Sequence, residues 1–291
     1  MTFFDSQTTK FPYPEDTAEH YIKTKQNRGL VFDEHYQYID RSKSFLLKQS
    51  LLRHVLFVLV YPITRIRLGL KINNKKVFKQ YKDLLSQGAI TISNHVHFWD
   101  YLAVMLTLRP AKPYILSWAP NLNDSDGKLV RLVGGIPIPE NNIKATFKQL
   151  KEVGQMLDEG GWLHIYPEGS MWEYYRPIRP FKKGFEYLAN KHHKPIIPMA
   201  FSYRKPNWIR RVIFRQIAVL NLNIGEPLTI NSSIDKNLQK GDLIKRAHEQ
   251  VVALAGLTKE ENIYEPIYHH SKRIDYYAHK SDSNSNKKQI D

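Results

Sequence analysis

The sequence predicts an α/β fold with a mixed, largely parallel sheet flanked by helices, preceded by an amphipathic, membrane-associating helix. Two observations lead to this prediction. Short apolar runs alternate with helix-length segments between residues 71 and 262, and strands separated by helices form parallel or mixed sheets. Before this region, apolar residues recur at three- and four-residue spacing, which is typical of a helix with one apolar face. At 291 residues, the chain is long enough for one main domain.

Residues 1–43 are predicted to form an irregular arm, because their aromatic and charged side chains follow no sustained period. The first twenty residues lack the basic start and apolar centre of a signal peptide, so we expect a cytoplasmic protein. The chain has no cysteine, which excludes disulfides, thiolate metal sites and cysteine nucleophiles.

Residues 44–70 are predicted to form an amphipathic interfacial helix that ends at Pro62. The most apolar stretch, residues 54–64, is shorter than the roughly 20 residues needed to span a bilayer. We therefore expect the helix to lie in the headgroup layer, where its basic flanks attract anionic lipid. A core helix packed on its own domain would show the same apolar stripe, and the sequence leaves both interpretations open.

Residues 71–262 are predicted to form the α/β domain, and residues 263–291 a polar tail. An amphipathic segment covers residues 77–85. The expected strands are residues 89–93, 114–118, 136–138, 162–166, 196–203 and 217–224. The expected helices are residues 101–108, 145–159, 184–191 and 242–257.

The surface charge predicts an anionic partner, because 43 Lys and Arg against 28 Asp and Glu give a net charge of +15. Lipid headgroups and nucleic acid are both anionic. The aromatic and basic cluster at residues 203–215 matches no nucleic-acid-binding module. We therefore expect a membrane surface with anionic lipids as the partner, and no nucleic acid.

Polar side chains gather where the strand at residues 89–93 runs into the following helix. Open α/β sheets place their ligands at the carboxyl ends of strands. Four residues separate His95 from Asp100, a spacing that lets the carboxylate bond one imidazole nitrogen and leave the other to accept a proton. Taken alone, the pair is more simply explained by a helix cap at Asp100 and a histidine bonded to backbone.

A second polar turn follows the strand expected at residues 162–166. Glu168 precedes Gly169 there, which places a carboxylate beside a residue that lets backbone approach a ligand closely. A Pro-Glu-Gly turn by itself is more often structural than functional. Its position at a strand end makes it a candidate part of the same site.

Together these turns resemble the signature of the glycerolipid acyltransferase superfamily, which includes the 1-acylglycerol-3-phosphate acyltransferases. The resemblance covers roughly residues 85–205 and rests on four blocks in the family's order: residues 94–100, 166–170, 181–184 and 195–198. Joint occurrence of these blocks is far more specific than either turn alone.

The resemblance implies transfer of a fatty acyl group from acyl-CoA or acyl carrier protein to a lysolipid hydroxyl, most directly 1-acyl-sn-glycerol-3-phosphate, in phospholipid biosynthesis. It implies that His95 is the catalytic base, that Asp100 orients it, and that Glu168, Gly169 and Ser170 belong to the acceptor site. It implies no metal and no cofactor besides the acyl donor. With the interfacial helix, it predicts a peripheral enzyme on the cytoplasmic, inner face of the membrane.

Two departures from the family pattern concern the acceptor. The family's second block usually reaches an arginine where this chain has Glu140 and Asn141, and its third block has an arginine where this chain has Met171. Guanidinium groups suit phosphate. Either another basic residue substitutes, or the acceptor is a glycolipid or another neutral hydroxyl compound. The candidate phosphate-binding residues are Arg131, Lys144, Arg176, Arg179, Lys182 and Lys183.

The same residues allow other interpretations. His95 and His97 could supply two ligands to a metallohydrolase centre, but Trp99 and Asp100 stand where that family needs an aspartate and a histidine. The pairs His192-His193 and His269-His270 lie in polar stretches that are typical of surface. A Ser170 nucleophile is disfavoured because the second glycine of a hydrolase elbow is missing. A non-enzymatic lipid-binding protein is the remaining alternative.

Overall fold

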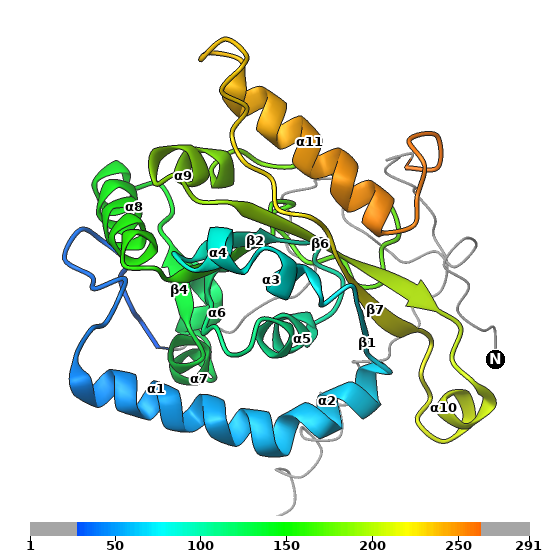
Figure 1. Ribbon diagram of the computed structural model, residues 1–291. Coiled ribbons are helices and arrows are strands. Elements are labelled where there is room, and N and C mark those ends of the chain that lie inside the picture. Colours follow the sequence, from blue (N-terminus) through cyan, green and yellow to red (C-terminus); the bar gives the residue numbers. More distant parts are fainter. Residues whose placement is uncertain (1–27, 263–291) are drawn as a thin grey trace, which may run out of the picture.

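A seven-stranded sheet forms the centre of the protein, with strand order β1-β7-β6-β2-β5-β3-β4 (Figure 1). The computed structural model describes residues 28–262, so most of the predicted arm and the predicted tail at 263–291 lie outside the described residues. Strands β2 to β6 run parallel, whereas β7 is antiparallel to β6 and β1 is parallel to β7. This arrangement confirms the predicted mixed, largely parallel sheet. The strands are β1 (Lys71–Asn73), β2 (Ala89–Ile92), β3 (Tyr114–Trp118), β4 (Gly135–Ile138), β5 (Trp162–Ile165), β6 (Ile196–Arg204) and β7 (Val219–Ile224).

Both faces of the sheet are covered, as its apolar strands require. Along β6, Ile196 and Ala200 belong to one apolar core, while Ile197, Met199 and Phe201 belong to another, because successive side chains point to opposite faces. The first core is closed by α8 (Ile143–Asp158), α9 (Phe185–Lys191) and α11 (Gln239–Leu254). The second is closed by α3 (Val77–Gln80), α4 (Lys82–Leu85) and α5 (Asp100–Thr107).

All the predicted strands and long helices are present, with ends shifted by a few residues. The amphipathic segment at 77–85 forms the two short helices α3 and α4, which meet at Tyr81. Strand β1 was not predicted, because three residues at a sheet edge show no period. Three further short helices were also not predicted: α6 (Ala119–Asn123), α7 (Gly127–Leu132) and α10 (Trp208–Val212).

The N-terminal helix is longer than the sequence predicted. Helix α1 (Lys43–Val55), a π-helical turn η1 (Leu56–Val60) and α2 (Tyr61–Leu68) form one continuous helix of 26 residues. Pro62 does not end it, because the proline falls at the start of α2, directly after the π-helical turn. There the ordinary hydrogen-bond pattern is already shifted, so the missing N–H costs little. The helix ends instead at Gly69, whose φ of +57° forms a left-handed cap.

The apolar side of this helix is exposed. Leu47, Leu51, Val58, Leu59 and Ile63 all face solvent. A core helix would bury them, so that interpretation is wrong. At about 1.5 Å per residue the helix is about 39 Å long, against about 30 Å for the hydrocarbon core of a bilayer. By length and composition it can cross a membrane, so the prediction that the segment is too short, based on residues 54–64, was also wrong.

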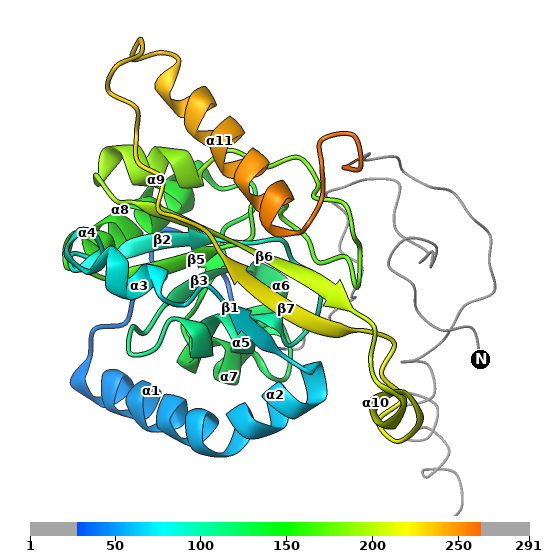
Figure 2. The same ribbon diagram turned by 45° about the vertical axis from the view of Figure 1, so that its right-hand side comes forward.

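The described part of the arm, residues 28–42, packs against the domain without forming a helix. Tyr38 is completely buried in the first core. The backbone N–H of Ile39 donates to Glu152 Oε2 at 2.8 Å, and that of Leu30 donates to Asn123 Oδ1 at 2.7 Å. The arm therefore passes α8 on its way to α1, and both views place the long helix and α11 on opposite sides (Figures 1 and 2).

Candidate active site

The register of two neighbouring strands brings the two predicted turns together. Strands β2 and β5 are parallel, and Ile92 lies opposite Ile165. His95 and Glu168 each follow three residues later, so they meet at the same edge of the sheet. The backbone N–H of His95 donates to Glu168 Oε2 at 3.3 Å.

His95 and Asp100 are in direct contact. His95 Nδ1 lies 2.8 Å from Asp100 Oδ2, and Asp100 is completely buried at the start of α5. The same oxygen accepts the backbone N–H groups of Val96 at 2.9 Å and His97 at 3.2 Å. The carboxylate therefore orders the turn and the imidazole together. It does not cap α5, because Trp99 is the N-cap residue and no side chain makes a cap hydrogen bond there.

The charge of Asp100 fixes which nitrogen of His95 carries the proton. Burial raises the pKa of Asp100, but His95 and the hydrogen bonds from His95, Tyr166 and Val96 outweigh it, so the pKa lies below its ordinary value. An ionised carboxylate only accepts hydrogen bonds. His95 Nδ1 must therefore donate, and Nε2 carries the lone pair of the neutral ring. The side chain of His95 is 24% exposed, so a substrate can approach this ring.

Tyr166 is a member of this site that the sequence did not single out. Its ring stacks on the His95 imidazole, with centroids 3.8 Å apart and planes 7° apart. Its hydroxyl donates to Asp100 Oδ1 at 2.6 Å. Burial and the charge of Asp100 raise the pKa of Tyr166 well above its ordinary value, so the phenol stays neutral and keeps donating. Tyr166 thus holds the imidazole by its ring and the carboxylate by its hydroxyl.

Glu168 is paired with a buried arginine. Arg179 NH2 lies 2.9 Å from Glu168 Oε2, and the backbone N–H of Arg179 donates to Glu168 Oε1 at 3.0 Å. The same guanidinium donates to Ser170 Oγ at 2.7 Å and to the Ser170 carbonyl. Glu168, Ser170 and Arg179 are all buried. Arg179 is therefore occupied in ordering this turn, and its role as a phosphate ligand stays a prediction.

The other candidate phosphate ligands are dispersed. Arg131 donates to the backbone carbonyls of Gln37 and Tyr38, so it holds the arm, and its role as a phosphate ligand stays a prediction. Lys144 is exposed at the start of α8, the helix that follows β4. Strand β4 is the third strand from β2 in the sheet, so the two strands are about 14 Å apart at the usual strand spacing. Arg176 is half-buried, and Lys183 is exposed.

Lys182 is the exposed cation that lies against the Glu168-Gly169 turn. Its backbone N–H donates to the Pro167 carbonyl at 2.7 Å. Gly169 has a φ of +82°, and a Cβ placed there would lie 2.6 Å from Lys182 Nζ. Glycine is therefore needed at this position both for the backbone conformation and for the room that Lys182 occupies.

At the two positions where the family usually has an arginine, this chain has Glu140 and Met171. Glu140 Oε1 accepts a hydrogen bond from Trp118 Nε1 at 2.8 Å. Met171 is buried. Neither residue supplies a positive charge.

Two further histidines near the site are buried. His97 Nδ1 accepts the backbone N–H of Trp99 at 2.9 Å, and burial lowers the pKa of His97 to about 4. His164 lies with Nδ1 2.9 Å from Thr91 Oγ1, and burial lowers its pKa to about 3. Both rings are therefore neutral at physiological pH. The sequence did not indicate His164, whose burial depends on the pairing of β2 with β5.

The metallohydrolase interpretation finds no support in this geometry. His95 and His97 each use Nδ1 in a hydrogen bond within the turn. Within residues 28–262, no group of three or more His, Asp or Glu side chains gathers as a metal site would require. His192 bonds Asp158 at 2.9 Å, and His269-His270 lies outside the described residues.

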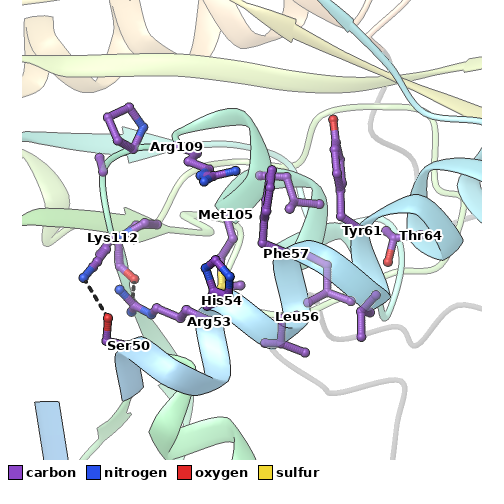
Figure 3. Close-up of a pocket in the computed structure, with 16 residues that line it drawn as sticks. Ser50, Arg53, His54, Leu56, Phe57, Tyr61, Thr64, Met105, Arg109 and Lys112 are labelled. Carbon is purple, nitrogen blue, oxygen red and sulfur yellow. Dashed lines mark hydrogen bonds between the residues drawn. The ribbon is translucent and has the colours of Figure 1, made fainter. Parts of the chain in front are cut away.

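A cavity of about 180 Å³ lies beside the site, between the N-terminal helix and α5 (Figure 3). Its lining combines apolar side chains such as Phe57 and Met105 with the basic Arg53 and Arg109. His95 and Asp100 are not part of this lining. Met105 follows Asp100 by five residues, about 7.5 Å along the helix axis. The cavity therefore adjoins the site along α5 without being the site itself.

Comparisons with known proteins agree with this site. The sequence model of the acyltransferase family matches residues 69–202, which include His95, Asp100 and Glu168. The 1-acyl-sn-glycerol-3-phosphate acyltransferases of Limnanthes douglasii and Cocos nucifera are 32% and 26% identical to this chain over 178 and 191 residues. These matches cover 55% and 60% of this chain, and 61% and 60% of the relatives. The chain thus spans about three fifths of the length of the curated relatives it matches.

Among solved structures, the 1-acyl-sn-glycerophosphate acyltransferase PlsC from Thermotoga maritima is 15% identical, with a TM-score of 0.40. That match covers 72% of this chain and 96% of the other. The sequence matches, not the structural one, carry this likeness. Over residues 69–202 the chain is similar to the acyltransferase family.

Proposed function

We propose that this protein transfers a fatty acyl group from acyl-CoA or acyl carrier protein to a hydroxyl of a lysolipid. The observation that carries the proposal is the 2.8 Å contact between His95 Nδ1 and the buried, ionised Asp100. This contact leaves His95 Nε2 as a base beside an open surface. The match of residues 69–202 to the acyltransferase family model supports the same reaction.

In this reaction, His95 Nε2 accepts the proton of the acceptor hydroxyl as its oxygen attacks the thioester carbonyl. The new ester C–O bond forms, the C–S bond breaks, and the proton passes from His95 to the departing thiolate. Asp100 stabilises the imidazolium that exists between these two events. Positioned general bases of this kind typically contribute a factor of about 10² to 10⁴ in rate.

The first acceptor to consider is 1-acyl-sn-glycerol-3-phosphate, because the matched relatives are named for it. Lys182, exposed beside Gly169, would pair with its phosphate. A neutral acceptor such as a glycolipid is favoured by a different observation. Glu140 and Met171 stand where the family usually has arginines, and Arg179 is already paired with Glu168.

The exposed apolar side of the N-terminal helix supports a membrane surface as the place of reaction. The net charge of +15 favours anionic lipid. A lysolipid acceptor resides in such a surface. We therefore propose a peripheral enzyme on the cytoplasmic face of the membrane, with the N-terminal helix as its anchor.

An acceptor panel tests the proposal. Purified protein is given labelled acyl-CoA or acyl carrier protein with lysophosphatidic acid, with the matching monoacylglycerol that lacks the phosphate, or with a glycolipid. Ester formation with at least one acceptor is expected, and its absence with all of them would refute acyl transfer. If lysophosphatidic acid is the acceptor, Lys182→Gln should raise its KM by about tenfold. Lys183→Gln, one residue away, is the matched control.

A further inference from the structure

We propose that the segment between β6 and β7, residues 204–215, is a second membrane-contact surface that inserts apolar side chains beside the N-terminal helix. This inference rests on the proposed association with a membrane and adds a contact to it. The segment contains α10, a single turn and a half of helix that projects beyond the end of the sheet in both views (Figures 1 and 2).

The apolar side chains of this segment are unusually exposed. Trp208 is 67% exposed and Val212 65% exposed, and these two residues lie one helical turn apart on the same side of α10. Ile209, Ile213 and Phe214 are exposed next to them. Large apolar residues gathered on a protruding turn mark an interaction surface, whereas isolated ones do not.

The charge of the segment selects an anionic, flat partner. Residues 204–215 contain five basic side chains, and no acidic residue lies between Arg204 and Glu226. Tryptophan next to arginine is the composition of segments that sit at the level of lipid headgroups, with the indole at the interface and the cations on phosphate. An anionic bilayer satisfies both the apolar and the basic side chains at once.

Hydrogen bonds attach this segment to the end of the N-terminal helix. Arg210 NH1 donates to the Ile66 carbonyl, and Arg204 NH2 donates to the Gly69 carbonyl at 2.6 Å. Ile66 itself is exposed. The apolar surface of the helix therefore continues onto α10, and both lie on the side of the molecule opposite α11 (Figures 1 and 2).

The same end of the helix contacts the candidate active site. The guanidinium of Arg67 lies 5.0 Å from the ring centroid of Trp99, in the turn between His95 and Asp100. A bilayer that covers both α2 and α10 would therefore lie beside the turn that carries the base. This continuity favours a bilayer over a second copy of the chain, because one flat surface covers both apolar areas and also delivers a lipid acceptor.

The absence of cysteine from the chain permits a direct test with single-cysteine variants. An environment-sensitive fluorophore is placed at Val212→Cys, at Leu51→Cys on the helix, and at Ser233→Cys in the exposed loop before α11 as a control. Vesicles of phosphatidylcholine, with and without phosphatidylglycerol, are then added. The proposal expects a blue shift and brightening at positions 212 and 51 with the anionic vesicles, and no change at 233.

A blue shift of the fluorophore at position 51 without one at position 212 would overturn the proposed second contact and leave the helix as the membrane anchor. A shift at 212 that depends on protein concentration without vesicles would identify a second copy as the partner and would also overturn the proposal. These outcomes do not depend on acyl transfer, since the fluorescence is read without substrate. Failure of the acceptor panel would therefore be a separate result.

A matched pair of variants measures the contribution of α10 to binding. Val212→Asp places a charge in the proposed contact, and Leu238→Asp places the same charge on a residue of nearly equal exposure, 64%, at the start of α11. Sedimentation with anionic vesicles should show binding about tenfold weaker for Val212→Asp and unchanged binding for Leu238→Asp. Equal binding by both variants would contradict the proposal.

Discussion

Asp100 uses both of its carboxylate oxygens, and this explains the rigidity of the His95 side chain. Oδ2 accepts from His95 and from the backbone of the turn, while Oδ1 accepts the Tyr166 hydroxyl. A histidine fixed by its partner on one side and by a stacked ring on its face loses little freedom when it takes up a proton. Preorganisation of this kind lowers the barrier without any movement at the moment of reaction.

Tyr166→Phe is predicted to separate the hydroxyl from the ring. Phenylalanine keeps the stacking on His95 but leaves one oxygen of the buried Asp100 without its donor. We expect kcat to fall by about tenfold with KM nearly unchanged, and the free energy of unfolding to fall by about 1 kcal/mol. Steady-state kinetics across pH measure the first effect, and urea unfolding measures the second.

Tyr187→Phe is the matched control, because Tyr187 lies on α9 and its hydroxyl accepts only from Lys191 among the contacts within residues 28–262. If Tyr166→Phe left kcat and its pH profile unchanged, Tyr166 would have no positioning role.

The buried histidines predict a loss of stability in mild acid. Burial holds the pKa of His97 at about 4 and that of His164 at about 3, while an unfolded chain has histidine near 6.5. Below pH 6.5 these histidines bind protons in the unfolded state but not in the folded state. The stability of the folded state is therefore highest above pH 6.5 and declines as the pH falls. Between pH 6.5 and 5, each of these two histidines should lower the free energy of unfolding by roughly 2 kcal/mol.

Urea unfolding at pH 7 and pH 5 measures this decline. His97→Asn keeps an acceptor for the Trp99 N–H and cannot take up a proton, so its decline should be smaller than that of the wild type. His35→Asn, at an exposed histidine, should leave the decline unchanged. Identical declines in the wild type and His97→Asn would contradict this account.

The sequence could predict the contact between His95 and Asp100, because the two residues are only five positions apart in the chain. It could not predict the Tyr166 hydroxyl or the Arg179 guanidinium in the site. Those contacts depend on which strands are neighbours and on how the loop after Glu168 folds back. The hydrogen bonds that Arg131 and Arg179 make within the fold were not predictable either, since charge in a sequence does not reveal whether the charged group is already paired.

At the scale of elements, the N-terminal helix is attached to the domain by few contacts. Arg53 NH2 donates to the backbone carbonyls of Pro113 and Val133 at 2.8 and 2.9 Å, and burial lowers its pKa. The helix periodicity was legible in the sequence. Its passage through Pro62 and the exposure of its apolar side were not, because they depend on the π-helical turn and on what the domain leaves uncovered.

Arg53→Met is predicted to loosen this attachment. Methionine fills much of the same space but leaves both carbonyls without a donor from the helix. We expect a loss of about 1–3 kcal/mol in the free energy of unfolding and faster amide hydrogen exchange in α1. Lys48→Met, at an exposed position of the same helix, is the control and should change neither quantity. Unchanged exchange in α1 of the Arg53 variant would show that other contacts hold the helix.

At the scale of the whole molecule, charge and exposed apolar surface act in the same direction. The helix and α10 lie together on the side opposite α11 (Figure 2), and the chain carries a net charge of +15. Composition predicted the charge and an anionic partner. The placement of two apolar surfaces on one side of the molecule required the fold, because residues 44–68 and 208–214 are far apart in sequence.

Binding to anionic vesicles should therefore depend strongly on salt. Raising the ionic strength from about 0.01 to 0.15 M shortens the Debye length from about 30 to 8 Å, which should weaken binding by at least about tenfold. Binding to vesicles of phosphatidylcholine alone should be weaker and nearly insensitive to salt. Co-sedimentation at the two ionic strengths measures both. Equal salt dependence with the two lipid compositions would show that charge does not direct the binding.

We propose that His95 is the base of an acyl transfer. The most direct test of this role is single-turnover transfer of a labelled acyl group by the wild type and by His95→Asn. His192→Asn is the control, because His192 pairs with Asp158. Circular dichroism confirms that each variant is folded. The rate of His95→Asn should fall by about 10³ or more, and His192→Asn should match the wild type. Transfer by His95→Asn within tenfold of the wild-type rate would contradict the claim.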